Sequence, residues 1–310
     1  MTQASEQVVA AHWGEMATKP AAICSWLDSP AVMRHVNRMI SGDPALGWFV
    51  YACQKYLMKN GRGVAKGLSI GCGGGALERA ARQIGACDVI DAIDIAPGAI
   101  EEARKMAALQ GLSGINYAVA DLDALDLGAN AYSVVFASAS VHHVTNLERL
   151  FANVAKCLNR GGLFIMLEYV GPSQFQFSDK AVQIINDILA LLPLACRQRF
   201  SNASEYVTKF ERTTIEHMNV TDPSEAIRSA EILPLLAKTF TIIERKDFGG
   251  TLLHMLLQDI AHNFPDDLPD RSAILNLLLY LEALLIRENV IASDFCFVVA
   301  TPSELSRERE

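Results

Sequence analysis

Four glycines that follow an apolar segment near residue 70 give the strongest chemical signal in this chain. Leu68-Ser69-Ile70 predicts the end of a strand, Gly71 to Gly75 contains the glycines, and a helical pattern follows. Glycine lets the backbone approach a ligand where a Cβ would collide, and the helix behind the turn presents unpaired N–H groups. The segment therefore predicts a nucleotide site, with a plain glycine-rich loop as the alternative.

A second apolar segment, residues 88–95, predicts a strand with an acid near its end. Asp94 lies about 20 residues after Gly75, which is the distance expected for a carboxylate that binds ribose hydroxyls. Asp91 is the competing acid, and on a strand the two side chains point to opposite faces. Asp94 is nearer the carboxyl end of the strand, where ligands bind, so we assign the ribose to Asp94.

Two further predicted strands indicate which nucleotide is bound. Residues 115–122 end in Ala120-Asp121-Leu122, and residues 132–140 are followed by Val141-His142-His143. With these motifs, residues 66–170 resemble the class I S-adenosylmethionine-dependent methyltransferases. A dehydrogenase fits less well, because residue 76 is alanine where the spacing GxGxxG requires a glycine.

The resemblance implies S-adenosylmethionine as the cofactor, with S-adenosylhomocysteine as the product. In that family Asp121 would hold the adenine amino group and the backbone N–H of Leu122 a ring nitrogen, whereas a strand-end acid that caps a turn is the alternative for Asp121. The residues assigned to the cofactor are Gly71, Cys72, Gly73, Gly75, Asp94, Ile95, Asp121, Leu122 and Ser138.

The chain departs from the family at Ser69, where many members have an acid that helps to fix the ammonium group of the cofactor. A serine hydroxyl is a neutral and weaker acceptor than a carboxylate. We therefore expect the ammonium group to be held by backbone carbonyls of Gly71 to Gly73, or by another acid.

The candidate bases lie at the ends of the fourth and fifth predicted strands. Methyl transfer from a sulfonium needs an aligned nucleophile, exclusion of water and, for an O–H or N–H⁺ nucleophile, removal of a proton. His142, His143, Glu168 and Tyr169 could remove that proton. In an extended segment the two histidines cannot point the same way, so we expect one to face the site and the other to pack; a structural histidine is the alternative for each.

The candidate acceptor-binding residues lie in helical segments outside the sheet. Gln174 and Phe175 follow the fifth strand, where an amide and a ring could orient an acceptor; a solvated turn is the alternative. Trp13 could contact cofactor or substrate from the amino-terminal block, or pack between helices. His254 could reach the site, although its apolar neighbours favour a core histidine.

Composition restricts the partners. The chain has 310 residues, 51% of them hydrophobic, a net charge of −8 and seven cysteines without a CxxC pair. A zinc cluster or disulfide framework is not indicated, so we expect no metal and a cytoplasmic location. The amino terminus predicts no signal peptide, and no apolar stretch predicts a membrane span. A small-molecule acceptor is favoured over nucleic acid, because no basic run is present to neutralise phosphates.

The pattern of elements predicts an α/β fold. Alternating strands and helices indicate a doubly wound parallel sheet, and the resemblance implies seven strands with the last one antiparallel between its neighbours. We divide the chain into an amino-terminal helical block (1–65), a cofactor-binding core (66–171), an inserted helical cap (172–239) and carboxyl-terminal elements (240–310). Residues 271–288 predict a nearly all-apolar helix buried in the core or at a homodimer interface.

Overall fold

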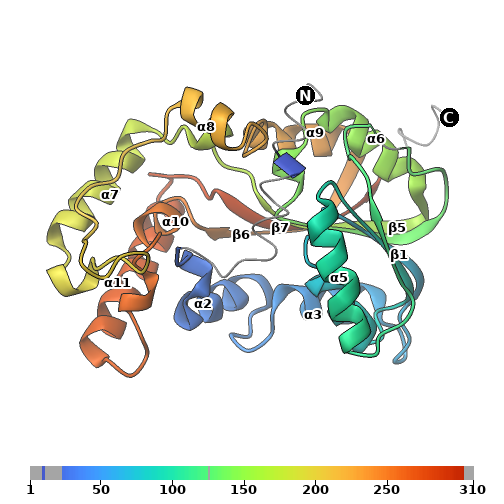
Figure 1. Ribbon diagram of the computed structural model, residues 1–310, viewed down its shortest axis with the longest axis horizontal. Helices are drawn as coiled ribbons and strands as arrows, with labels where there is room; N and C mark the ends of the chain where they lie inside the picture. The colour runs from blue at the N-terminus through green and yellow to red at the C-terminus, as the bar shows by residue number, and fades with distance from the viewer. Residues whose placement is uncertain (1–8, 11–22, 125, 304–310) are drawn as a thin grey trace.

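The computed structural model describes residues 9–10, 23–124 and 126–303. A seven-stranded sheet runs through its centre, with helices on both faces (Figure 1). Its strands are β1 Val64–Ile70, β2 Cys87–Asp94, β3 Ile115–Val119, β4 Tyr132–Ser138, β5 Leu158–Tyr169, β6 Phe240–Gly249 and β7 Phe295–Pro302.

The strand order is β3-β2-β1-β4-β5-β7-β6. Strands β1 to β5 are parallel, and β7 runs antiparallel between β5 and β6. This topology confirms the predicted doubly wound fold with an antiparallel last strand. The order reverses between β1 and β4, and in open α/β sheets the crevice beyond the carboxyl ends of the strands at such a reversal binds ligands.

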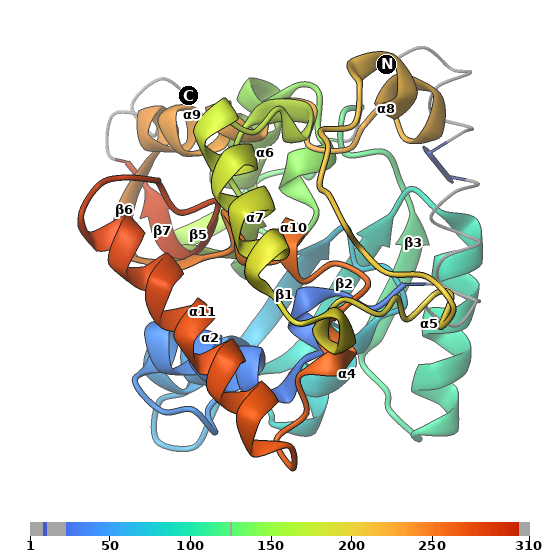
Figure 2. The same cartoon turned by 90° about the vertical axis from the view of Figure 1, so that its left-hand side faces the viewer.

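Strand β4 shows how one apolar segment supports both layers of the core. Val134 and Phe136 pack into the cluster on one face, whereas Val135 and Ala137 pack into the cluster on the other face. A strand covered on both faces reads as a continuous apolar run because alternate side chains point to opposite sides. Figure 2 shows α6 and α9 on one side of the sheet and α2, α4 and α11 on the other.

Helices connect the strands of the sheet and pack on its two faces. The longer helices are α2 Pro30–Ser41, α3 Trp48–Ala52, α4 Ala76–Gln83, α5 Pro97–Leu109, α6 Leu147–Cys157, α7 Asp179–Leu191, α8 Ile215–Thr221, α9 Ile232–Thr239, α10 Leu253–Leu256 and α11 Pro269–Arg287, and the π-helix η2 Cys53–Leu57 continues α3.

Two sequence signals for helix starts can be compared with the structure. Proline is typical of a first helical turn, and Pro97 occupies the first turn of α5. The spacing of Thr145 and Glu148 predicts a capping box, but this prediction is wrong, because Asn146 is the N-cap of α6 and its side chain accepts from the Arg149 N–H. The Thr145 N–H instead donates to Asp123, which leaves the asparagine as the residue next to the first helical turn.

The segment 172–239 is less helical than its pattern predicts. The sequence pattern predicts helices over 177–192 and 223–237. Helix α7 confirms the first, but the second begins only with α9 at Ile232. The side chain of Asp222 accepts from the backbone N–H of Ser224, and this local turn competes with helix formation. The division of the chain into four parts stays a prediction.

Helix α11 is buried on one face only. Leu275, Leu278 and Leu279 pack into the core, whereas Leu277 is 64% and Tyr280 is 57% exposed. The helix therefore packs against the core through one face, and a homodimer interface on the other face stays a prediction. None of the described helices combines the length and the apolar character needed to cross a membrane.

Candidate active site

A cavity of about 750 Å³ lies at the carboxyl ends of β1, β2 and β4. This volume falls in the range of small-molecule sites, about 300 to 1,000 Å³. Among the residues predicted at the cofactor, those that line it are Gly71, Cys72, Gly73, Asp94, Ile95, Asp121, Leu122 and Ser138. The structure therefore brings together segments from four strand ends, as the sheet topology requires.

The glycines of the turn have different roles. Gly73 has φ +50°, and a Cβ built on it would meet no heavy atom within 4 Å, so its missing side chain leaves open space at the cavity. A Cβ on Gly71 would collide with Ser140. Gly75 does not line the cavity; a Cβ there would lie 2.5 Å from the Tyr117 hydroxyl and 2.8 Å from Ala103 Cβ, so this glycine permits helix–sheet packing.

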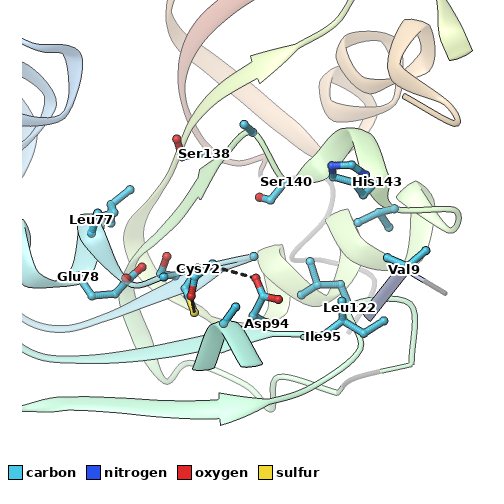
Figure 3. A pocket seen from close by; sticks show the side chains of 18 of the residues that line it. Val9, Cys72, Leu77, Glu78, Asp94, Ile95, Leu122, Ser138, Ser140 and His143 are labelled. Atoms are coloured by element: carbon cyan, nitrogen blue, oxygen red, sulfur yellow. Dashed lines mark hydrogen bonds between the residues drawn. The ribbon is translucent and has the colours of Figure 1, made fainter. Parts of the chain in front are cut away.

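Asp94 is the carboxylate of β2 that reaches the cavity. Its Oδ2 accepts from the Gly73 N–H at 2.8 Å and its Oδ1 from the Ala96 N–H at 2.9 Å, so it also fixes the glycine turn (Figure 3). The competing Asp91 instead accepts from Asn116 and Tyr132 outside the cavity. The geometry agrees with the choice of Asp94 over Asp91, and the ribose role itself stays a prediction.

The two histidines occupy a 3₁₀ turn, η3 Val141–His143, so the extended segment that we expected is wrong. The backbone of β4 ends at Ser138, and its continuation bends because Ala139 has φ +50°. His143 lines the cavity, whereas His142 is 7% exposed and does not. His143 therefore faces the cavity and His142 is packed, and the role of either histidine as a base stays a prediction.

Glu168 fixes this turn from the end of β5. Its Oε1 accepts from the backbone N–H groups of Ser140 and Val141, both at 2.7 Å, and its Oε2 accepts from His142 Nδ1 at 2.7 Å. A carboxylate with three donors is a positioning group here. Burial alone would lower the pKa of His142, but the charges of Glu168 and Glu225 raise it above its ordinary value.

The other histidine is oriented by a loop of the segment 172–239. His143 Nδ1 lies 3.0 Å from Ser224 Oγ, and Ser224 Oγ lies 2.7 Å from Asp222 Oδ1. An ionised carboxylate only accepts, so the serine proton points to Asp222 and His143 Nδ1 must donate to the serine. In neutral His143 this arrangement leaves Nε2 as the unprotonated nitrogen, which is the form required of a base.

Glu225 completes the cluster beside the histidines. Its Oε1 lies 3.5 Å from His142 Nε2, and its Oε2 lies 4.0 Å from His143 Nε2. Desolvation by burial raises the pKa of Glu225 above its usual range. One ligand atom from each of these three residues lies within 4.8 Å of the others, a spacing that could also hold a metal ion.

Four further predicted residues, Tyr169, Gln174, Phe175 and His254, do not line the cavity. The hydroxyl of buried Tyr169 donates to the Pro172 carbonyl, and burial raises the pKa of Tyr169 far above its ordinary value. Phe175 and His254 pack on the Tyr169 ring, and burial, with a smaller effect of the charge of His142, lowers the pKa of His254 to about 4. The side-chain Nε2 of Gln174 donates a hydrogen bond to Asn219 Oδ1 at 3.0 Å. Their roles stay predictions.

Two groups of site residues escaped the sequence analysis, and one predicted residue cannot be placed. Trp13 lies outside the described residues. Glu78 lines the cavity, but an acid in the first turn of a helix is ordinary and gave no signal. Ser224 and Glu225 fell in the helix predicted over 223–237, and Asp222 directly precedes it. The local pattern Asp-Pro-Ser-Glu, typical of a turn, could have indicated a loop.

Comparison with known proteins agrees with this geometry. Residues 68–166 match the family model described as "Methyltransferase domain". Aklanonic acid methyltransferase DauC of Streptomyces sp. (strain C5) is 41% identical over 96 residues, 31% of this chain and 44% of that protein. The ubiquinone biosynthesis O-methyltransferase of Coxiella burnetii (strain Dugway 5J108-111) is 30% identical over 95 residues, 31% and 39% of the two chains. The chain thus spans less than half the length of these curated relatives.

A solved structure extends the likeness over the whole fold. Geranyl diphosphate C-methyltransferase from Streptomyces coelicolor A3(2), crystallised with Mg²⁺, geranyl diphosphate and S-adenosyl-L-homocysteine, has a TM-score of 0.54 at 12% identity and covers 98% of this chain and 100% of that chain. At this identity the likeness shows the fold alone. The matched family model, together with the curated relatives, identifies residues 68–166 as a methyltransferase domain. For these residues the resemblance found in the sequence is confirmed.

Proposed function

We propose that the whole chain transfers a methyl group from S-adenosylmethionine to an O or N nucleophile of a small molecule by direct displacement. The observation that supports this most is the cavity itself, because it joins the glycine turn and Asp94 to a histidine whose tautomer suits a base. When bound, S-adenosylmethionine supplies a methyl group already activated on a sulfonium. The protein then has to hold the cofactor, orient the acceptor and remove the acceptor's proton.

The chain offers groups for each part of the cofactor. The open space at Gly73 admits a ligand close to the backbone, and Asp94 can accept from ribose hydroxyls beside it. Asp121 and Leu122 line the cavity at the end of β3, where the adenine is expected. Because these residues come from separate strand ends, the sheet holds them at fixed spacing before any ligand arrives.

His143 is the proposed base. It lines the cavity, and Ser224 and Asp222 orient its ring through Nδ1. Nε2 can then take the proton of an acceptor hydroxyl as the methyl bond forms and the bond to sulfur breaks. For an ammonium acceptor, Nε2 takes the proton first, so that the nitrogen has the lone pair that attacks the methyl group. Glu168 and His142 are positioning residues, because Glu168 holds the backbone of the 3₁₀ turn that carries both histidines.

A C-methyltransferase is the second candidate, because a protein with the same fold, the geranyl diphosphate enzyme described above, is a C-methyltransferase. The cofactor residues would be the same, and the base would instead remove a proton from carbon. A binding protein that holds S-adenosylmethionine without transfer, and an NAD-dependent oxidoreductase, are further alternatives that the sequence left open.

A titration separates these classes. We expect purified protein to bind S-adenosylmethionine and S-adenosylhomocysteine by calorimetry and not NAD. Incubation with methyl-labelled S-adenosylmethionine and panels of phenols, carboxylic acids, amines and activated carbon acids then reports the acceptor atom, with the His143→Ala variant as the matched control. NAD binding without binding of the two sulfur nucleotides would refute the proposal, and cofactor binding without transfer to any panel would favour the binding protein.

A further inference from the structure

Glu78 is a buried carboxylate without a partner at the edge of the cavity. It lies in the first turn of α4, has no exposed surface and lines the cavity. Neither of its oxygens makes a hydrogen bond of normal geometry to any of the residues that the structure describes. A buried charge without a partner is costly, and such groups in native proteins usually have a ligand or function. A cationic ligand group would satisfy it.

The electrostatics around Glu78 agree with a missing cation. Burial raises the pKa of Glu78 to about 7, and the Ser69 hydroxyl and the backbone amide of Glu78 itself offset only part of this effect. The charge of the neighbouring Arg79 lowers the pKa less than burial raises it, and Asp94 raises it further. The Arg79 guanidinium is engaged elsewhere, because its Nη1 donates to the Gly74 carbonyl at 2.6 Å.

The position of Glu78 indicates which part of the proposed cofactor it meets. In Figure 3 Asp94 lies between Glu78 on one side and Leu122 and Ile95 on the other. With the ribose at Asp94 and the adenine at Leu122, the amino-acid moiety of S-adenosylmethionine extends toward Glu78 and Ser69, both of which line the cavity. That moiety carries an ammonium group, which donates three hydrogen bonds and has the positive charge that would pair with the Glu78 carboxylate.

We infer that Glu78 binds the ammonium group of the methionine moiety of S-adenosylmethionine, in place of an acid at Ser69. The acidic side chain lies in the first turn of the helix that follows the strand, and it lines the same cavity as Ser69. This inference rests on the proposed function. It adds a binding residue that the glycine motif and the strand-end acids do not include.

The test compares two ligands on the same protein. S-adenosylhomocysteine carries the ammonium group, and its deaminated analogue has hydrogen in that place. Glu78→Gln removes the charge from the hydrogen bond to the ammonium group. From the strength of hydrogen bonds to charged groups, we expect this variant to bind S-adenosylhomocysteine about 10- to 150-fold more weakly. Binding of the deaminated analogue should stay within about threefold of wild type, because it has no group to lose at that carboxylate.

Two further variants serve as controls for this comparison. Glu101→Gln removes a carboxylate from the exposed face of α5 and should leave both affinities unchanged. Glu78→Asp keeps the charge but shortens its reach, so it should weaken S-adenosylhomocysteine selectively and by less than Glu78→Gln; it also decides the question if Glu78→Gln does not fold. A loss that is equal for both ligands, or no loss for S-adenosylhomocysteine, would overturn the assignment.

The two levels of the hypothesis fail differently. If wild-type protein binds neither ligand, the proposed function is wrong, and the assignment of Glu78 is overturned with it. If wild-type protein binds S-adenosylhomocysteine and Glu78→Gln binds it equally well, the function stands and only the role of Glu78 is refuted.

Discussion

Glu78 should make the unliganded protein less stable as the pH rises. A group whose pKa is raised on folding favours the native state when protonated, and this stability is lost as the pH rises through the folded value. The pKa of Glu78 is about 7 in the folded protein, against an ordinary value of 4.5. The contribution is therefore fully present below pH 4.5 and is lost above pH 7.

The magnitude follows from these two values. A difference of one pKa unit corresponds to about 1.4 kcal/mol, so the full loss is about 3 kcal/mol, and about 2.5 kcal/mol of it falls between pH 5 and pH 8. Glu78→Gln has nearly the same shape and cannot ionise, so this variant should gain about 2.5 kcal/mol relative to wild type over that interval. Other titrating groups are common to both proteins and cancel in the comparison.

The assay is urea unfolding of wild-type and Glu78→Gln protein at pH 5 and pH 8, without ligand and with saturating S-adenosylhomocysteine. We expect the variant to be the more stable protein at pH 8 without ligand and to gain less than wild type from the ligand. Stability curves of the two proteins that run parallel with pH would refute the reasoning, because they would mean that Glu78 is solvated or paired in the folded state.

The other predictions concern the proposed cofactor site and the base. Asp94→Ala should weaken S-adenosylhomocysteine binding by about 1.5 to 3 kcal/mol in calorimetry, whereas Asp91→Ala should leave it unchanged; the reverse would reassign the ribose. Gly73→Val should lose ligand binding, because its side chain would enter the open space at the cavity. The φ of +50° strains a β-branched residue, so circular dichroism has to show that the variant is folded; normal binding by the folded variant would place the cofactor elsewhere. His143→Ala should lower kcat about 10²- to 10⁴-fold at unchanged cofactor affinity and His142→Ala should lower it less, whereas normal rates in both would exclude the histidines as bases.

Much of the fold could be predicted because its signals are local. An apolar strand, a glycine turn and a helix within some fifteen residues determine one βα unit, and repeated units leave few topologies. The site residues on strand ends followed from the same logic, and Asp94 could be separated from Asp91 because strand periodicity assigns opposite faces to the two. Gly75 shows the limit, since its packing against Tyr117 and Ala103 depends on neighbours that sequence spacing does not identify.

The missed residues depend on contacts that are distant in the sequence. His143 and Ser224 are 81 residues apart, and the intervening chain includes strand β5, the three helices α6, α7 and α8, and long irregular segments. No periodicity predicts which loop returns to the histidines. Glu78 was missed for a different reason, because its place in a first helical turn has an ordinary explanation in the helix dipole. Only its complete burial shows that this explanation is insufficient.

The loop that orients His143 also explains how acceptor choice and catalysis could be coupled. Asp222 and Ser224 lie in the same turn-rich segment as Ala226, whose carbonyl accepts from the Gln174 N–H at 2.7 Å, and the Ile227 N–H donates to the His142 carbonyl at 3.2 Å. A shift of this segment would therefore move the partner of the proposed base together with the turn that carries Gln174. An acceptor that fits poorly would then make fewer contacts and would also leave the base misoriented. Poor acceptors should therefore differ from good ones more in kcat than in KM.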